Sequence, residues 1–373
     1  MTLSILWFIL VAVLWTVYLI LEGFDFGVGM LLPFAAKGDR ERTQMVRTIG
    51  PHWDGNEVWL LTAGGATFAA FPEWYATMFS GMYLALFLIL VCLIIRIMAL
   101  EWRSKVATEK WRRTWDWAHT ICAWLVPLLL GVAFANFVAG MHIEVVDVAT
   151  GTVVDPTLVN QSLASATHQL TGGFFSLLTP YTLLGGLAVL AVCLAHGAQF
   201  LALKTTGEVR DRANAIAAPA TIAATVLAAA WLVWGQFAYT TNVLAWIPLV
   251  VAALAIIAST ALSQSSLRRE GLSFVASSVA IAGTVAWVFA SMAPAVQKSS
   301  INPAYSLTIG QASSTDATLT VMTIVTVCLL PIVLAYVAWS YWTFRGRVGT
   351  EDVTTRTGLL MKKIRLGENF LAG

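Results

Sequence analysis

Long apolar stretches separated by short polar segments dominate the pattern of this chain. A helix needs about 20 mostly apolar residues to cross the hydrocarbon core of a bilayer, and nine stretches approach or exceed that length. They predict membrane-spanning helices at about 5–34, 54–72, 75–100, 114–140, 172–203, 214–239, 242–263, 271–294 and 316–344. The pattern therefore predicts an all-α integral membrane protein with about nine transmembrane helices.

The composition supports the same fold class. Of the 373 residues, 58% are hydrophobic and only 11% are charged, whereas soluble domains are roughly 45–50% apolar and about 25% charged. The chain has too few charged residues to cover the surface of a soluble protein. We therefore expect membrane lipid around the chain. The formal net charge of +2 gives no reason to expect a nucleic-acid partner.

The lysines and arginines predict the orientation. Twenty of the 22 fall in alternate connections between the apolar stretches or in the C-terminal segment. Because basic connections stay on the cytoplasmic side, we expect the N-terminus outside and the C-terminus in the cytoplasm. The opposite connections hold only Lys298, and the longest of them, 141–171, carries three acidic residues and no basic one.

We expect a single membrane domain over residues 1–373. Within it, residues 1–140 form an N-terminal bundle, 141–171 an outer loop, 172–344 a C-terminal bundle with the last helix, and 345–373 a basic cytoplasmic tail. Residues 354–373 either lie on the inner leaflet as an amphipathic segment or form a disordered tail.

Charged residues inside the apolar stretches need a specific reason, because one near the bilayer centre costs about 2.5–3.5 kcal/mol on insertion scales. Glu22 and Asp25 are three residues apart in the first predicted span and therefore share a helix face. Asp54 and Glu57 repeat this spacing at the start of the second span, and Arg96 lies late in the third. All five fall in the cytoplasmic half. Since a carboxyl group both accepts and donates protons, they predict a proton pathway open to the cytoplasm.

Several polar residues have simpler alternative interpretations. Asp54 could cap a helix start and Arg96 could extend toward the membrane surface, whereas Asp116 is predicted to be a first-turn acid favoured by the helix dipole. His119 and His196 could bind haem iron or a metal, but an isolated intramembrane histidine is more often a hydrogen-bonded packing residue. No Cys-x-x-Cys or zinc-like spacing occurs, so we predict no metal site in this chain.

Two motifs carry a family resemblance. The first runs from Glu22 to Met30 (EGFDFGVGM) and the second from Pro51 to Trp59 (PHWDGNEVW), continuing as LLTAGGA. Together with Arg96 and shorter matches up to residue 140, they resemble subunit II of cytochrome bd-type quinol oxidases. The number and orientation of the spans agree over the whole length. Where relatives often carry Asp-Gly-Phe-Asp and Gly-Asn-Gln, this chain has Glu22 and Glu57.

The resemblance implies a heterodimer of two related nine-helix subunits, each with two four-helix bundles and one peripheral helix. The haem-bearing partner, subunit I, would carry a low-spin haem b, a high-spin haem b and haem d, and the complex would oxidise quinol and reduce dioxygen to water. The present chain would bind no haem, would be inactive alone and could hold a structural quinone. Small accessory subunits could join the complex in a bacterial cytoplasmic membrane.

The resemblance also implies roles for particular residues. The positions that match Asp25 and Asp54, and with them Arg96, belong to the proton route in the family. Glu22 and Glu57 join them here because of their depth and spacing. Three further residues support the second motif: His52, Trp53 and Asn56.

A proton-coupled secondary transporter is the alternative function, because such proteins also place acids at mid-membrane depth, usually with interrupted helices and internal repeats. Neither feature is evident here, and the acids lie only in the N-terminal half. A scaffold subunit without chemistry is a third interpretation. We therefore expect a non-haem subunit of a respiratory quinol:oxygen oxidoreductase that contributes a route for proton uptake and stabilises its partner.

Overall fold

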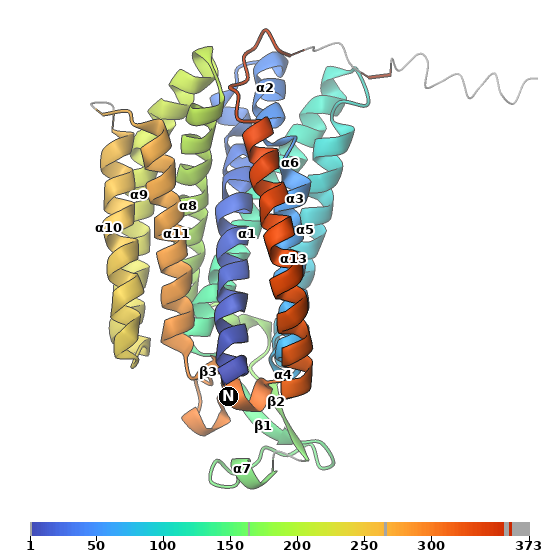
Figure 1. The fold of residues 1–373 in the computed structure, drawn as a ribbon, viewed down its shortest axis with the longest axis vertical. Helices are drawn as coiled ribbons and strands as arrows, with labels where there is room; N and C mark the ends of the chain where they lie inside the picture. The colour runs from blue at the N-terminus through green and yellow to red at the C-terminus, as the bar shows by residue number, and fades with distance from the viewer. Residues whose placement is uncertain (1, 163–164, 265–266, 354–357, 360–373) are drawn as a thin grey trace, which may run out of the picture.

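The computed structural model describes residues 2–162, 165–264, 267–353 and 358–359, and most of the described chain is helical (Figure 1). Short helices α2 (Asp39–Ile49) and α4 (Pro72–Gly81) lie between longer ones. The long helices are α1 (Thr2–Ala35), α3 (Trp53–Ala70), α5 (Tyr83–Trp102), α6 (Glu109–Ala139), α8 (Pro180–Lys204), α9 (Gly207–Tyr239), α10 (Trp246–Ser263), α11 (Glu270–Met292) and α13 (Asp316–Thr343). Apart from 358–359, the predicted tail segment 354–373 lies outside the described residues.

Eight of the described helices are long and apolar enough to cross a membrane, and they correspond to eight of the nine predicted spans. The remaining one, α3, has 18 residues, but Asp54, Asn56 and Glu57 in its first turns reduce its hydropathy. It nevertheless packs against α1 within the bundle. The chain is therefore a multi-pass membrane protein with a mostly helical fold.

Two of the predicted spans begin too early. Residues 75–81 belong to α4 rather than α5, and Pro72 occupies the first turn of α4, where its missing amide hydrogen costs nothing. The fifth span was predicted from residue 172, but α8 begins at Pro180. Thr179 and Thr182 form a reciprocal capping box there, which satisfies amide groups at the helix start.

The crossing helices form two groups of four, and α13 lies outside them (Figure 1). Helices α1, α3, α5 and α6 make the N-terminal bundle, and α8 to α11 make the C-terminal bundle. Helices α1 and α6 join the two, because α1 packs on α3 and α6 and also on α8 and α11, and α6 packs extensively on α8. Where α1 crosses α8, a β-carbon on Gly27 would lie 2.6 Å from the α-carbon of Gly197. The glycines thus allow direct contact between the two helix backbones.

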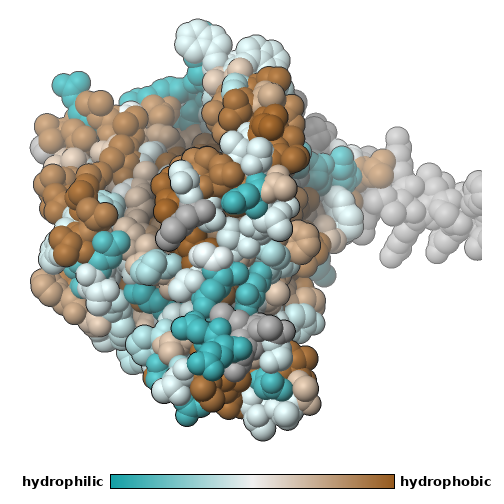
Figure 2. Space-filling view, turned by 60° about the horizontal axis from the view of Figure 1, so that its bottom comes forward, coloured by the Kyte–Doolittle hydropathy of each residue, from teal (hydrophilic) through white to brown (hydrophobic). Residues whose placement is uncertain are grey.

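The two ends of the bundle differ. One carries α2 and most of the basic connections, and the other carries two small antiparallel sheets. In one sheet β1 (Ile143–Asp147) pairs with β2 (Ala166–Leu170), and in the other β3 (Ala295–Gln297) pairs with β4 (Leu307–Thr308). The predicted outer loop is the β1–β2 hairpin with the short helix α7 (Val159–Ser162). Figure 2 shows hydrophilic side chains gathered over this end and hydrophobic surface along the helices.

Candidate functional site

The first acid pair lies inside the N-terminal bundle. Glu22 and Asp25 of α1 are fully buried, as is Arg96 of α5. Arg96 forms an ion pair with Glu22, and its guanidinium lies over the ring of Phe26, 4.8 Å from the ring centre. The alternative interpretation of Arg96 as a residue that extends toward the membrane surface is therefore wrong.

Asn56 links the acid pair to α3. Its amide nitrogen donates a hydrogen bond to Asp25 Oδ2 at 2.8 Å and lies 3.4 Å from the carbonyl oxygen of Leu21. Asn56 is only 2% exposed, so water does not compete for these bonds. A residue predicted only as support for the motif is thus a direct partner of a buried carboxyl group.

The second acid pair lies at the edge of this buried cluster. Glu57 is half-buried, with one carboxyl oxygen enclosed by the protein, and it lies within electrostatic reach of Arg96, Glu22 and Asp54. Asp54 is exposed in the first turn of α3. His52 occupies the capping position, and no side chain caps the helix, so the alternative interpretation of Asp54 as a helix cap is wrong.

One partner of the site was missed in the sequence. The Tyr341 hydroxyl of α13 donates to Asn56 Oδ1 at 2.7 Å. A tyrosine near the end of an apolar span usually anchors the helix at the membrane surface, so the local sequence gives no sign of this bond. Only the packing of α13 on α3 brings Tyr341 and Asn56 together.

The residues that flank α3 complete this side of the site. The ring of His52 stacks on that of Tyr341, with ring centres 4.1 Å apart and planes 3° from parallel. Burial, with a further contribution from the charge of Lys204, lowers the pKa of His52 to about 4, so the ring is neutral at pH 7. Trp53 is half-buried at the first position of α3.

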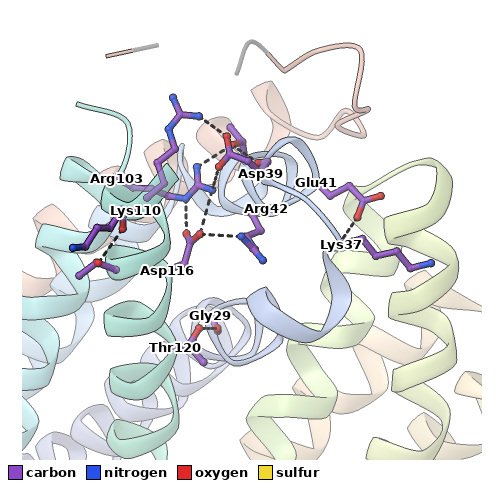
Figure 3. A network of polar contacts seen from close by, with 12 residues as sticks. Gly29, Lys37, Asp39, Glu41, Arg42, Arg103, Lys110, Asp116 and Thr120 are labelled. Carbon is purple, nitrogen blue, oxygen red and sulfur yellow. Dashed lines mark hydrogen bonds and ion pairs between the residues drawn. The ribbon is translucent and has the colours of Figure 1, made fainter. Parts of the chain in front are cut away.

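A network of ion pairs covers the α2 end of the N-terminal bundle (Figure 3). Arg103 reaches Asp116 of α6 at 2.5 Å and Asp39 of α2 at 2.7 Å, and Arg112 also pairs with Asp39. Arg42 lies 3.8 Å from Asp116. Helix α6 begins at Glu109, so the prediction that Asp116 is a first-turn acid is wrong. The network holds α2 against the ends of α5 and α6.

The buried histidines were predicted to be hydrogen-bonded packing residues, which holds for His196, whereas neither ring nitrogen of His119 has a hydrogen-bond partner among the described residues. His196 Nδ1 lies 2.6 Å from Ser277 Oγ, and Nε2 lies 3.1 Å from the Ile20 carbonyl oxygen. His119 Nε2 would lie 2.6 Å from a β-carbon added to Gly29, so this ring packs directly on α1. Both ring nitrogens of His196 thus have hydrogen-bond partners, which does not fit a haem ligand at that position.

Within the part of the chain that the structure describes, no three His, Cys, Asp or Glu side chains come together as a metal site would require. The carboxyl cluster instead includes a guanidinium group, which occupies the place that a cation would need. Carboxyl groups in such a cluster can accept and release protons.

Comparison with known proteins gives a consistent family. Residues 3–344 match the family model described as cytochrome bd terminal oxidase subunit II. The chain is 36% identical to cytochrome bd-I ubiquinol oxidase subunit 2 of Escherichia coli (strain K12), with 95% of this chain and 97% of that protein covered. It is 37% identical to cytochrome bd ubiquinol oxidase subunit 2 of Bacillus subtilis (strain 168), with 94% and 98% covered.

The fold agrees with this result. A chain from the solved structure of the bd oxidase of Geobacillus thermodenitrificans superposes with a TM-score of 0.70 and 16% sequence identity, over 92% of this chain and 99% of that one. The match at this low identity concerns the fold alone. With the family model and the curated relatives covering almost the full length, the chain belongs to the family of cytochrome bd terminal oxidase subunit II.

Proposed function

We propose that the chain is the non-haem subunit of a respiratory quinol oxidase, and that its acid cluster takes up protons from the cytoplasm for the reduction of dioxygen to water. Family membership and the names of the relatives support the activity of the complex. The observation that carries the proton role is the burial of Glu22 and Asp25 together with Arg96. No comparison supports the transporter alternative.

The number of carboxyl groups relative to the single positive charge of Arg96 explains why the cluster can hold and transfer protons. Arg96 balances one carboxylate, but Glu22, Asp25 and Glu57 supply three carboxyl groups within its electrostatic reach. An unbalanced charge in a protein interior is strongly disfavoured, so carboxyl groups that Arg96 does not balance hold protons. Such a proton stays transferable, because a neighbouring carboxylate or a water molecule accepts it without a change of fold.

The positions of the acids give the route a direction. Asp54 lies in the first turn of α3, and Glu57 lies one turn deeper. Asp25 is ten residues before the end of α1 at Ala35, which corresponds to a depth of about 15 Å. The basic connections at this end mark it as cytoplasmic. We therefore propose transfer from Asp54 to Glu57 and then to the Glu22–Asp25 pair.

The haems of a cytochrome bd complex belong, in this proposal, to the partner subunit I. Both ring nitrogens of His196 are engaged in hydrogen bonds, and the ring of His119 packs directly on α1. The chain then stabilises its partner and supplies protons to it, with quinol and dioxygen as substrates of the complex in a bacterial cytoplasmic membrane. Small accessory subunits could bind to this heterodimer.

A bound structural quinone is compatible with an apolar cavity in the N-terminal bundle. The cavity has a volume of about 500 Å³ and lies among α1, α3, α4, α5 and α6. Its lining is mostly apolar and aromatic, with Trp15, Phe68 and Phe134 among its residues. Such a surface suits an isoprenoid tail and an uncharged ring. Solvent extraction of the purified complex, followed by quinone quantification, tests this assignment.

The proton role is tested in the whole complex with Asp25→Asn. Asparagine has nearly the same size but cannot carry a proton, so quinol-driven oxygen uptake should fall by about 10-fold or more. The haem absorbance should remain. Asp316→Asn is the matched control, because Asp316 is an exposed acid at the opposite end of the bundle. Full turnover in Asp25→Asn would contradict the proposal, and loss of haem absorbance would indicate a structural role instead.

A further inference from the structure

Helix α13 reaches the acid cluster through one side chain. Leu319 is its only buried residue among those described, and the helix lies at the periphery of the two bundles (Figure 1). Tyr341, near its C-terminal end, is half-buried, and the hydroxyl is bonded to Asn56. Tyr341 therefore gives a lipid-facing helix a direct hydrogen bond into the interior of the N-terminal bundle.

The Asn56 amide transmits this contact to Asp25. An amide oxygen only accepts hydrogen bonds and an amide nitrogen only donates them. Here the oxygen accepts from Tyr341 at 2.7 Å, and the nitrogen donates to Asp25 at 2.8 Å and faces the Leu21 carbonyl at 3.4 Å. With the amide turned over, its oxygen would face two other acceptors. The Tyr341 hydroxyl thus helps to keep the amide donor aimed at Asp25.

The hydrogen bond from Tyr341 to Asn56 also changes the strength of the hydrogen bond from Asn56 to Asp25. Hydrogen bonds in a chain polarise one another, so donation to the amide oxygen makes the amide N–H a better donor. A strong donor at Oδ2 favours the carboxylate form of Asp25 over the protonated form. Loss of the tyrosine hydroxyl should therefore weaken the bond to Asp25 without removing any group from the acid cluster itself.

The aromatic ring of Tyr341 is held in place by the ring of His52, which in turn contacts Phe344. His52 stacks on it at 4.1 Å, and Phe344 lies edge-on to His52, with ring centres 5.8 Å apart. His52 is neutral at pH 7, because burial lowers its pKa to about 4. The stack therefore does not change with pH near neutrality, and the hydroxyl remains directed at Asn56.

We propose that Tyr341 is a positioning residue of the proton route, which acts through Asn56 to hold Asp25 in the hydrogen-bonded state that accepts and releases protons. The inference rests on the proposed role of Asp25. The charged and titratable groups around Asp25 are Glu22 on its own helix, Glu57 on α3 and Arg96 on α5. A change of Tyr341 to phenylalanine leaves all three in place.

The test compares Tyr341→Phe with Tyr336→Phe in the complete oxidase. Tyr336 lies on the same helix and is 65% exposed, so its hydroxyl serves as the matched control. Tyr341→Phe should lower turnover about fivefold, which corresponds to one hydrogen bond of about 1 kcal/mol. Haem absorbance and the KM for quinol should stay unchanged, and Tyr336→Phe should behave as the wild type.

Infrared difference spectra between the reduced and oxidised enzyme supply a readout that a purely structural role would not change. The carboxyl band of Asp25 is identified by its loss in Asp25→Asn. It should shift in Tyr341→Phe and stay in place in Tyr336→Phe. An Asp25 band at the wild-type position in Tyr341→Phe, or no Asp25 band in any of these enzymes, would overturn the inference. Full turnover in Asp25→Asn would instead overturn the proposed function, so the two failures are distinct.

Discussion

At the scale of single residues, the buried ion pair between Arg96 and Glu22 controls the electrostatics of the site. Both side chains are fully buried. A buried ion pair adds little net stability, because desolvation offsets the attraction, but removal of one partner leaves an uncompensated charge and costs about 3–5 kcal/mol. The stability of the protein should therefore fall when one partner of the ion pair is replaced, and much less when both are replaced by uncharged residues.

This asymmetry predicts the behaviour of two variants. Arg96→Leu should destabilise the complex by about 3–5 kcal/mol, whereas Glu22→Gln combined with Arg96→Leu should recover much of that loss, because the uncompensated charge is gone. The thermal unfolding midpoint of the purified complex measures both effects. Arg113→Leu, at an exposed site on α6, is the control. A double variant no more stable than Arg96→Leu alone would contradict the charge argument.

The residues of the site differ in how well the sequence predicts them. Glu22, Asp25 and Arg96 are found because a charge inside an apolar stretch is costly, and this cost is visible in the sequence. The roles of Asn56 and Tyr341 are not visible, because neutral polar groups at span ends carry little cost. Asp54 was predicted at the start of a buried route and is exposed in this chain, since α3 begins at Trp53 and leaves its first turn at the bundle end.

At the scale of helices, the contact between α1 and α8 depends on Gly27 and Gly197. A β-carbon on Gly27 would collide with the backbone of α8 at Cys193 and Gly197. Backbone atoms cannot rotate away as a flexible side chain would, so the helices must separate.

Gly27→Ala should therefore destabilise the complex by about 1–3 kcal/mol, the usual cost of overpacking. Gly271→Ala, in the first turn of α11, has no atom within 4 Å of the added β-carbon, and should leave stability unchanged or slightly improve it. Thermal unfolding of both variants measures the difference. Equal unfolding midpoints would show that α1 and α8 separate at no cost.

Lys298 joins two helix ends on the side opposite α2. Its ammonium group donates to the Tyr239 carbonyl oxygen at 3.0 Å and faces the Val138 carbonyl oxygen at 3.4 Å. These carbonyl groups belong to the last turns of α9 and α6, where a positive charge is favourable. Burial nevertheless lowers the pKa of Lys298 from 10.5 to about 8.

The lowered pKa of Lys298 predicts a pH dependence of stability. Between about pH 8 and 10.5 the unfolded chain retains a proton on Lys298 that the folded chain has released. The unfolded state then binds more protons, so the Lys298 contribution to the free energy of unfolding rises with pH over this range. The unfolding midpoint of wild type minus that of Lys298→Met should rise accordingly. A difference that is constant or falls with pH would contradict this assignment.

The helices themselves were largely predictable, and their ends were less so. Hydropathy reports length and apolar character, which decide whether a segment crosses the membrane. It does not report the capping box that starts α8 at Thr179, nor the break at Met82 that separates α4 from α5. These features depend on local hydrogen bonds within otherwise apolar or weakly polar segments.

At the scale of the whole molecule, the fold tolerates extensive sequence change. It superposes on a bd oxidase chain with a TM-score of 0.70 at 16% identity. A membrane bundle needs apolar surfaces and satisfied backbone groups more than particular residues, which is why hydropathy predicts the fold class. Hydropathy does not predict which helices touch. The position of α1 between the two bundles and the contact of α13 with α3 follow only from packing.

The central claim is that the buried acid cluster supplies protons to the oxidase, and proton uptake tests it most directly. A pH-sensitive dye on the cytoplasmic side of oriented vesicles can follow uptake after an oxygen pulse to the reduced enzyme. The account predicts that Asp25→Asn slows proton uptake and oxygen reduction together, with normal haem content, whereas Asp25→Glu retains both to a large extent. Unchanged proton uptake in Asp25→Asn would contradict the account.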